Sequence, residues 1–326
     1  MKKIFLHTAL LIALNTSAQQ KSLVNTSSSP YAKLTNVDMG DVAWTSGFWA
    51  ESMKMCKNSM VPNLWKTYTD KNISHAFKNF EIAAGLDTGS HKGPPFHDGD
   101  FYKLFESVAS IYAITKDKKL DELMDKVIPV IAKSQREDGY IHSPVIIEER
   151  KNSSKAKAFE DRLNFETYNM GHLMTAACVH YRATGKTTLL NVAIKAADYL
   201  DNFYKRSSPE LARNAICPSH YMGVVELYRT TNDKKYLELA KNLIDIRGLV
   251  ENGTDDNQDR VPFRQQKVAM GHAVRANYLY AGVADVYAET GDTSLLNCLD
   301  PIWQDVVNRK MYITGACGAR YVRVFP

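Results

Sequence analysis

The sequence predicts an all-α fold in which antiparallel helical hairpins close into a ring. Three observations support this prediction. A short signature recurs four times at helix ends, long stretches space their apolar residues at helical intervals, and few segments alternate with the period of two that marks a β-strand. With 326 residues and 44% hydrophobic content, the chain can also bury a large core.

The recurring signature is a tyrosine followed three residues later by a threonine. Each copy ends an apolar stretch and is followed by a polar turn and a second apolar stretch, which predicts a helix, a tight turn and another helix. The copies are Tyr112-x-x-Thr115, Tyr181-x-x-Thr184, Tyr228-x-x-Thr231 and Tyr287-x-x-Thr290. The fixed spacing favours a true repeat over four unrelated helix ends that share common turn residues.

The other segments are interpreted in chain order. Residues 37–50 carry two tryptophans and Phe48, which indicates an extended strand or clamp packed on the main body. Residues 51–84 predict one or two helices, and the glycine-rich stretch 85–99 predicts a loop. Irregular connections are expected at 135–162 and 248–266. Helices are expected at residues 101–115, 118–134, 166–184, 187–205, 216–231, 233–247, 270–290 and 292–309.

Helical hairpins with short turns either stack as an open solenoid or close into a ring. Irregular spacing between the copies and long, aromatic connections favour the ring, and loops gathered at one end of a scaffold often build an active site. Four hairpins, with a fifth near residues 51–84, fall short of a ring of six. We therefore expect an incomplete barrel.

Residues 1–18 have the pattern of a secretory signal peptide. Lys2 and Lys3 give the charged start, a short apolar run follows, and small residues precede a cleavage site after Ala18. The alternative is a buried first helix. Residues 19–36 are rich in Ser, Thr and Asn and predict a flexible lead-in. We therefore expect an exported protein, periplasmic or secreted, with no later segment able to span a membrane.

Charge and cysteine content narrow the function classes. Removal of residues 1–18 takes away two lysines and no acidic residue, so the formal net charge falls from +5 to +3. This charge is too small to argue for nucleic-acid binding. The five cysteines include no CxxC pair and match no zinc ribbon or finger. An odd count in an exported protein leaves at least one thiol unpaired or metal-bound.

The densest group of polar residues lies just before a predicted helix. Asp98 and Asp100 are two residues apart at the end of a glycine-rich loop. Asp100 is placed either to cap the helix that starts near Phe101 or to bind a ligand, because a carboxylate accepts the early backbone N–H groups. Asp98 has no such capping role, and we expect it to bind sugar hydroxyl groups.

Three further candidates for sugar binding follow. Tyr140 comes after a helix that ends near Gly139, and it is either a packed residue at a helix stop or part of a carbohydrate floor. Glu166 lies in the first turn of a long helix, where the helix dipole favours a negative charge. His172 lies six residues further on and is either a hydrogen-bonded core residue or a substrate ligand.

His272 and Arg275 open a later helix. They are three residues apart and share one face, so together they form either an oxygen-binding pair or part of an ion pair between helices. The sequence contains no GxSxG elbow, HExxH motif, Walker loop or complete dinucleotide fingerprint. The aromatic content is consistent with sugar stacking and equally with a large helical core.

Taken together, these motifs resemble one family, glycoside hydrolase family 127, the β-L-arabinofuranosidase-like proteins. The resemblance covers nearly all of the chain after residue 36 and implies an (α/α)6 barrel that acts as an exported bacterial glycosidase on arabinose-containing plant glycans. The most specific match runs from Gly271-His272-Ala273-Val274-Arg275 to Met311-Tyr312-Ile313-Thr314-Gly315. The other matches are Phe48-Trp49, Phe96 to Lys103, Gln135 with Asp138-Gly139-Tyr140, and Glu166 to Leu173.

The resemblance also implies a catalytic segment that this sequence lacks. In the family, three cysteines and a glutamate hold zinc, one of the cysteines is the nucleophile, and another glutamate is the acid/base. These follow the stretch that matches Met311–Gly315, yet no Glu-Thr-Cys and no adjacent cysteines occur here, and the position of Cys317 matches no zinc ligand. We therefore expect residues 37–319 to be a partial (α/α)6 catalytic domain and residues 320–326, which do not resemble the family's continuation, to be an aberrant tail. We expect this truncated chain to have no metal or cofactor of its own and little or no glycosidase activity.

Two alternative functions remain open. One is an inverting glycosidase or a polysaccharide lyase on the same toroid that uses carboxylates such as Asp98 and Glu166; inversion suits carboxyl groups about 6.5–9.5 Å apart. The other is a carbohydrate-binding fragment without catalysis. In each case the expected partner is a carbohydrate, with no nucleic acid and no membrane.

Overall fold

The computed structural model describes residues 21–153, 155–205, 208–214 and 220–318. The predicted signal peptide and the tail at 320–326 lie outside the described residues. In the described part, helices dominate, and the extended pairing is limited to an isolated bridge between Met311 and Cys317. The all-α prediction is therefore confirmed.

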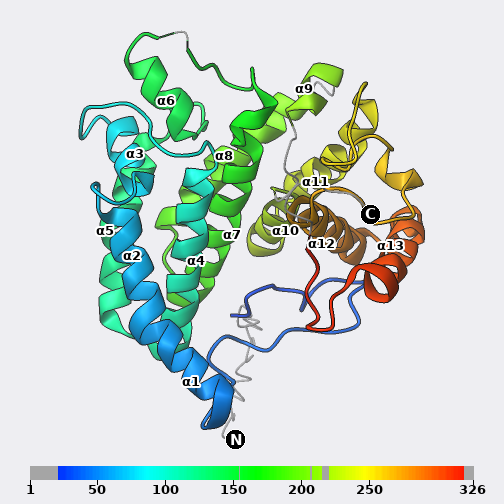
Figure 1. Ribbon diagram of the computed structural model, residues 1–326, viewed down its shortest axis with the longest axis horizontal. Helices are drawn as coiled ribbons and strands as arrows, with labels where there is room; N and C mark the ends of the chain where they lie inside the picture. Colours follow the sequence, from blue (N-terminus) through cyan, green and yellow to red (C-terminus); the bar gives the residue numbers. More distant parts are fainter. Residues whose placement is uncertain (1–20, 154, 206–207, 215–219, 319–326) are drawn as a thin grey trace, which may run out of the picture.

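Four helical hairpins form the body of the molecule. The first helix of each hairpin packs on the first helix of the next, and the second helices lie outside them (Figure 1). Buried side chains such as Phe105, Met174 and Leu243 fill the space between the two layers. The hairpins are α4 (His97–Thr115) with α5 (Lys118–Ser134), α7 (Glu166–Thr184) with α8 (Thr188–Tyr204), α10 (His220–Thr231) with α11 (Lys234–Ile246), and α12 (Ala273–Thr290) with α13 (Thr293–Asp305).

Further helices precede and connect the hairpins. A nearly continuous helical segment packs on α4 through its last part and leads to α3, in agreement with the helices predicted between residues 51 and 84. It consists of α1 (Gly47–Met55), η1 (Cys56–Met60) and α2 (Val61–Thr69), followed by α3 (Ala76–Ala83). The remaining elements are α6 (Ser143–Arg150), η2 (Arg162–Asn164), α9 (Pro209–Arg213), η3 (Arg247–Leu249), η4 (Phe263–Gln265) and η5 (Val306–Lys310).

Two local predictions were wrong. Residues 37–50 do not form a packed strand, because α1 begins at Gly47 and leaves Phe48 and Trp49 exposed at 75% and 63%. The connection at 135–162 contains α6, a short helix that begins with Ser143 and Pro144. Pro suits the first turn of a helix because its missing N–H would have no partner there. The apolar residues of α6 are buried, so packing supplies the stability that a short helix lacks by itself.

The Tyr-x-x-Thr repeat has a common structural cause. In all four copies the threonine is the last helical residue, and its hydroxyl donates to the backbone carbonyl four residues earlier at 2.7–2.8 Å. The same oxygen accepts the N–H two residues later at 3.0–3.4 Å. The residue directly after the threonine adopts the left-handed conformation, and its N–H donates to the carbonyl of the tyrosine. The four residues concerned are Lys116, Gly185, Asn232 and Gly291. The repeat is therefore a helix stop that turns the chain into the outer helix.

The threonine of this stop can be tested at Thr184. A Thr184→Val variant keeps the side-chain shape but loses the bonds to the His180 carbonyl and the Lys186 N–H. We expect the free energy of unfolding to fall by about 1 kcal/mol in urea denaturation. Thr188→Val, at an exposed position in the next helix, is the matched control and should change it by less than about 0.5 kcal/mol. Equal effects of the two variants would refute the proposed role of the hydroxyl.

The described part of the expected lead-in follows the barrel closely. The Tyr31 N–H donates to the Ala288 carbonyl at 3.0 Å, and the Ser29 hydroxyl donates to Glu289. Ser22 is fully buried. These contacts lie at the C-terminal ends of α10 and α12, opposite the end where the inner helices begin. We call residues 21–46 the strap, because they cross this end of the barrel.

A buried group of charges lies under the strap. Arg229 on α10 contacts Glu226 at 2.6 Å, Asp285 at 2.8 Å and Glu289 at 2.6 Å. Arg182 on α7 reaches the other oxygen of Glu226 at 2.6 Å and also donates to the Leu23 carbonyl of the strap. These contacts join three inner helices and the strap at the same point.

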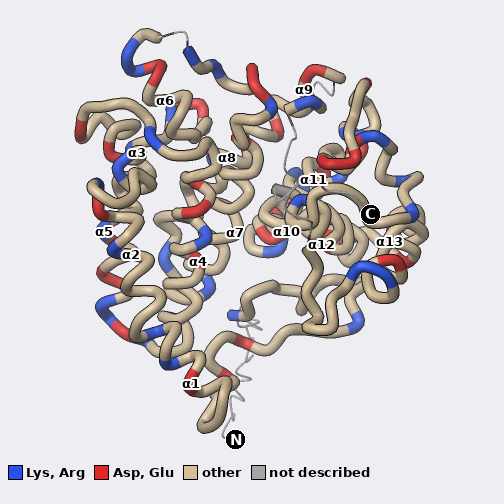
Figure 2. The backbone as a smooth tube through the Cα atoms, viewed as in Figure 1, with Lys and Arg blue, Asp and Glu red and all other residues tan. Residues whose placement is uncertain are grey.

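Charges elsewhere are mixed. Lysines and arginines alternate with acidic residues along most helices, without a long stripe of one sign (Figure 2). The expectation that the chain binds no nucleic acid stays a prediction. In the part of the chain that the structure describes, every helix is too short or too polar to cross a membrane.

Candidate functional site

A cavity of about 540 Å³ lies between the inner helices. Its walls come from the first helical segment, α4, α7, α10, α12 and the strap, so it occupies the lumen of the barrel. The lining residues are Leu23, Trp44, Met53, Cys56, Lys103, Glu106, Ser107, Ser110, Ile111, Ile114, His172, Thr175, Met222 and Tyr278. A neighbouring cavity of about 330 Å³ shares Lys103 and Ser107 and adds Tyr68 and Asp100.

Lys103 contacts several polar groups at the end of the lumen where α4 and α7 begin. Its ammonium lies 2.8 Å from Asp100 and donates to the Tyr168 hydroxyl at 2.7 Å. His97 lies 3.7 Å from the other Asp100 oxygen. Burial opposes ionisation of Asp100, but hydrogen bonds from His97 and Lys103 lower its pKa below the ordinary value. The pair therefore offers an ammonium to the lumen and a carboxylate to the neighbouring cavity.

His172 lies on α7 beside this pair. Its ring makes edge contacts with Tyr168 at 4.5 Å and Tyr278 at 5.4 Å between centroids. Burial, reinforced by the charge of Lys103, lowers the pKa of His172 to about 3, so the imidazole is neutral. Its Nε2 is buried and has no hydrogen-bond partner in the described residues. A neutral ring nitrogen can donate to or accept from a ligand hydroxyl, depending on its tautomer.

An aromatic group extends from His172 to the mouth of the barrel. Tyr168 packs with Phe96, Phe165 and Tyr278. Phe165 is held in the left-handed conformation immediately before α7 and contacts Phe96 at 5.3 Å. Aromatic rings of this kind can contact the apolar face of a sugar while polar groups bind its hydroxyls.

Arg275 lies near Phe165 at the mouth of the barrel, where the inner helices begin. The Arg275 guanidinium lies 5.8 Å from the Phe165 ring centroid and pairs with Asp256 at 2.6 Å. His272, the expected partner of Arg275, is the residue before α12, and burial, with the nearby Arg275 charge, lowers its pKa. Neither side chain lines the lumen cavity. A direct role of either residue in sugar binding stays a prediction.

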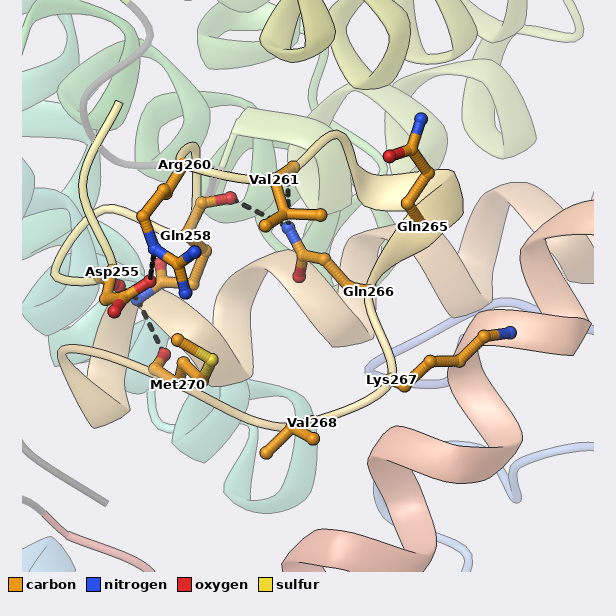
Figure 3. A pocket seen from close by; sticks show the side chains of 9 residues that line it. All are labelled: Asp255, Gln258, Arg260, Val261, Gln265, Gln266, Lys267, Val268 and Met270. Atoms are coloured by element: carbon orange, nitrogen blue, oxygen red, sulfur yellow. Dashed lines mark hydrogen bonds and ion pairs between the residues drawn. The ribbon is translucent and has the colours of Figure 1, made fainter. Parts of the chain in front are cut away.

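The loop before His272 is held by its own polar side chains. Gln258 donates to the Asp256 carbonyl at 2.9 Å. It also donates to the Met270 carbonyl at 3.0 Å, and Gln266 donates to the Gln258 carbonyl at 2.9 Å (Figure 3). A small cavity of about 130 Å³ remains in this loop. We assign these contacts the role of fixing the position at which α12 begins.

Asp98 is enclosed by protein partners. The Ser143 N–H and hydroxyl donate to its two oxygens at 2.7 Å and 2.6 Å, and the side chain is 1% exposed. Burial raises the pKa of Asp98 to about 6 despite these hydrogen bonds. Asp98 therefore anchors the start of α6, 45 residues away in sequence. The expectation that it binds sugar hydroxyls is not supported by this geometry.

Glu166 and Tyr140 form a second enclosed pair. The Tyr140 hydroxyl donates to Glu166, and the Phe159 N–H lies 2.9 Å and 3.0 Å from the two carboxylate oxygens. Both side chains are buried, and neither lines the lumen. They hold the loop before α7, so the expected sugar contacts of Tyr140 and Glu166 also lack support. An inverting pair of Asp98 and Glu166 is not favoured, because protein donors occupy both carboxylates.

Two of the residues predicted from the sequence, Asp100 and His172, therefore lie at or beside the lumen, and other residues complete its polar wall. The structure brings Asp100 and His172 together and adds Lys103, Tyr168 and Tyr278. Lys103 could have been found, because it follows Asp100 at the three-residue interval that places side chains on one helix face.

Comparisons with known proteins agree with this fold. A family model described as the GH127 catalytic domain of β-L-arabinofuranosidase matches residues 41–325. A non-reducing end β-L-arabinofuranosidase from Bifidobacterium longum subsp. longum is 32% identical over 86% of this chain and 48% of its own length. A GH127 β-L-arabinofuranosidase structure from Geobacillus stearothermophilus T6 has a TM-score of 0.79 at 31% identity, covering 88% of this chain and 48% of that one.

A further solved structure, described as a glycoside hydrolase, shares 54% identity with a TM-score of 0.73 and covers 92% of this chain and 42% of that one. The fold and its relatives define a glycoside hydrolase scaffold built as a helical barrel. The chain belongs to family GH127, the β-L-arabinofuranosidase family. It spans about half the length of the relatives that it matches.

The zinc that the family resemblance implies has no matching ligand set in the described residues. No group of three or more His, Cys, Asp or Glu side chains there could hold a metal ion. Cys178 and Cys298 are buried singly, and the Cys317 sulfur accepts a hydrogen bond from Asn277 at 3.0 Å. Cys217 lies outside the described residues. These residues therefore support no catalytic step through zinc.

Proposed function

We propose that this chain provides the sugar-binding wall of a β-L-arabinofuranosidase-type site and binds an arabinofuranosyl group in the lumen. The observation that carries the proposal is the lumen cavity, which is lined by the Lys103 ammonium, the neutral His172 imidazole and the Tyr278 ring. Asp100 and Tyr168 lie directly behind this wall, because both are bonded to Lys103. Lys103 donates to sugar hydroxyls, His172 bonds to another hydroxyl through Nε2, and Tyr168 and Tyr278 contact the ring carbons. The printed names of the relatives support arabinose as the sugar.

We further propose that the chain is exported, acts on arabinose-containing plant glycans, and by itself hydrolyses them little or not at all. The charged and apolar pattern of residues 1–18 supports export. The scattered cysteines support weak hydrolysis, because a thiol is a good nucleophile only when its pKa is depressed, whereas burial raises the pKa of Cys178 to about 12. A clear rate on p-nitrophenyl β-L-arabinofuranoside by the purified chain would contradict this part.

Binding is tested by calorimetric titration of the 326-residue chain with methyl β-L-arabinofuranoside. Lys103→Met removes the ammonium but keeps most of the side-chain volume, and we expect at least tenfold weaker binding, about 1.4 kcal/mol. Lys66→Met, at an exposed position on α2, is the matched control and should not change affinity. Equal affinities of the wild type and Lys103→Met would show that the sugar does not occupy the lumen.

A further inference from the structure

A second pocket opens outside the lumen, at the end of the barrel where α7 begins. It has a volume of about 320 Å³ and is lined by Asp138, Tyr199, Asn202, Phe203 and Leu211. Tyr199, Asn202 and Phe203 belong to the last turns of α8. Since α8 runs antiparallel to α7 after a tight turn, these residues lie at the mouth end of the barrel, on its outer layer.

The aromatic wall of this pocket is rigid. The rings of Tyr199 and Phe203 are inclined by only 12°, with centroids 6.2 Å apart. Phe159 stacks on Phe203 at 4.1 Å, and the edge of Tyr140 supports Tyr199 at 5.3 Å. Tyr199 and Phe203 are each partly exposed, whereas Phe159 and Tyr140 behind them are buried. Two nearly parallel rings therefore face the pocket from a fixed backing.

The polar edge of the pocket is fixed as well. The Tyr140 N–H and the Arg136 Nε both donate to Oδ1 of Asp138, each at 3.1 Å. Arg136 also donates to Oδ2 of Asp138. The Arg136 guanidinium lies 4.8 Å from the Tyr140 ring centroid. A carboxylate has about four acceptor positions, so Asp138 can still accept from a ligand hydroxyl. The exposed amide of Asn202 adds donors and an acceptor.

Gly139 explains why this edge stays close to α8. A Cβ at this position would lie 2.2 Å from the Lys195 carbonyl oxygen, and the residue has a φ of +97°. Only glycine adopts this conformation readily and permits the close approach. The turn that carries Asp138 is therefore held against the aromatic wall. This turn lies in a segment that the sequence analysis singled out, and the lumen does not use it.

We propose that this outer pocket is a second carbohydrate-binding site, which holds one pentose unit of an arabinose-containing glycan. The proposal rests on the proposed function for its choice of sugar. Stacked rings at one wall and a carboxylate and an amide at the edge match a ligand with an apolar ring face and several hydroxyl groups. The volume lies at the small end of the roughly 300–1,000 Å³ typical of ligand pockets, which suits a single sugar.

The Tyr140–Glu166 pair lies between the two sites. Tyr140 supports Tyr199 on its outer side, and its hydroxyl donates to Glu166 in the first turn of α7, the helix that carries His172. The pair thus gives both sites a common, rigid base. Its enclosed position fits a supporting role.

The test is a titration of the 326-residue chain with a linear L-arabinofuranosyl trisaccharide. Binding is measured by calorimetry and by changes in amide chemical shifts. Tyr199→Leu keeps an apolar side chain but removes the ring, and Asn202→Ala changes only an exposed amide. We expect each to weaken one binding event by fivefold or more, while the event that Lys103→Met weakens is unchanged. Phe48→Ala, which removes an exposed ring on α1, is the control.

The outcomes separate the two proposals. Binding that persists in Lys103→Met and is lost in Tyr199→Leu and Asn202→Ala supports the outer site, even if the lumen binds no sugar. A single binding event that neither Tyr199→Leu nor Asn202→Ala weakens would overturn the outer site and leave the lumen proposal intact. Asn202→Ala keeps the test decisive if Tyr199→Leu fails to fold.

Discussion

Replacement of Arg229 by methionine is expected to lower the free energy of unfolding by about 3–5 kcal/mol. The Arg229 side chain is only 3% exposed and is the shared partner of Glu226, Asp285 and Glu289. Loss of the guanidinium leaves Glu226 and Glu289 almost fully buried and Asp285 partly buried. Among the described residues, only Glu226 then keeps another cation, Arg182. The large effect comes from uncompensated charge rather than from the loss of favourable pairing.

The pH dependence of the stability of Arg229→Met shows whether the loss comes from unpaired charges or from lost packing. Burial, the largest influence, already raises the pKa of Asp285 to about 6 with Arg229 present. Without the guanidinium this pKa rises further. When the pKa of a carboxyl group is higher in the folded than in the unfolded state, the folded state binds the proton more tightly. The free energy of unfolding therefore falls as pH rises and this proton is lost. The deficit of Arg229→Met should therefore be larger at pH 8 than at pH 5.

Denaturation in guanidinium chloride at several pH values measures both the loss of stability and its dependence on pH. The matched control is Arg260→Met, which removes a similar side chain from a single exposed pair with Asp255 and should cost at most about 1 kcal/mol. If Arg229→Met were no more destabilising than Arg260→Met, the buried charges would not hold the inner helices together. A deficit that does not change with pH would assign the loss to packing instead.

The second large effect is expected at Glu166. Burial raises its pKa to about 7, although hydrogen bonds from Tyr140 and Phe159 oppose the shift. The folded-state pKa is above the ordinary value of 4.5, so the stabilising contribution of this group is complete below that value and is lost as pH rises through about 7. Glu166→Gln keeps a neutral side chain of the same shape and cannot ionise.

We therefore expect the stability of Glu166→Gln relative to the wild type to rise by about 2–3 kcal/mol between pH 5 and pH 8. Urea denaturation at each pH measures this difference. Glu122→Gln, an exposed position on α5, should show no such trend. A difference between Glu166→Gln and the wild type that stays constant over this range would mean that Glu166 is already ionised in the folded protein at pH 5.

The hairpins were predictable because their causes are local. Each Tyr-x-x-Thr stop is closed by bonds from the threonine hydroxyl to groups at most four residues away, so four similar sequences give four similar turns. The helix α6 was not predictable by the same means. Its start depends on Asp98, 45 residues earlier, and its apolar residues have no amphipathic spacing that marks a helix.

The candidate site was only partly predictable for a related reason. A sequence shows that Asp98, Tyr140 and Glu166 are polar, but not that Ser143 and Phe159 satisfy them within the protein. A carboxylate near a helix start suits both a ligand and a structural partner, and only the packing decides between the two roles. The spacing of Asp100 and Lys103 predicts that they share a helix face, but the contact of Lys103 with Tyr168, 65 residues later, depends on the packing of α4 on α7.

A crystal structure of the chain with methyl β-L-arabinofuranoside would show whether the lumen, around Lys103 and His172, binds an arabinofuranosyl group. We expect a sugar whose hydroxyls lie within about 3 Å of Lys103 Nζ and His172 Nε2, with its ring against Tyr168 or Tyr278. A sugar bound elsewhere, with only solvent in the lumen, would show that the lumen is not the binding site.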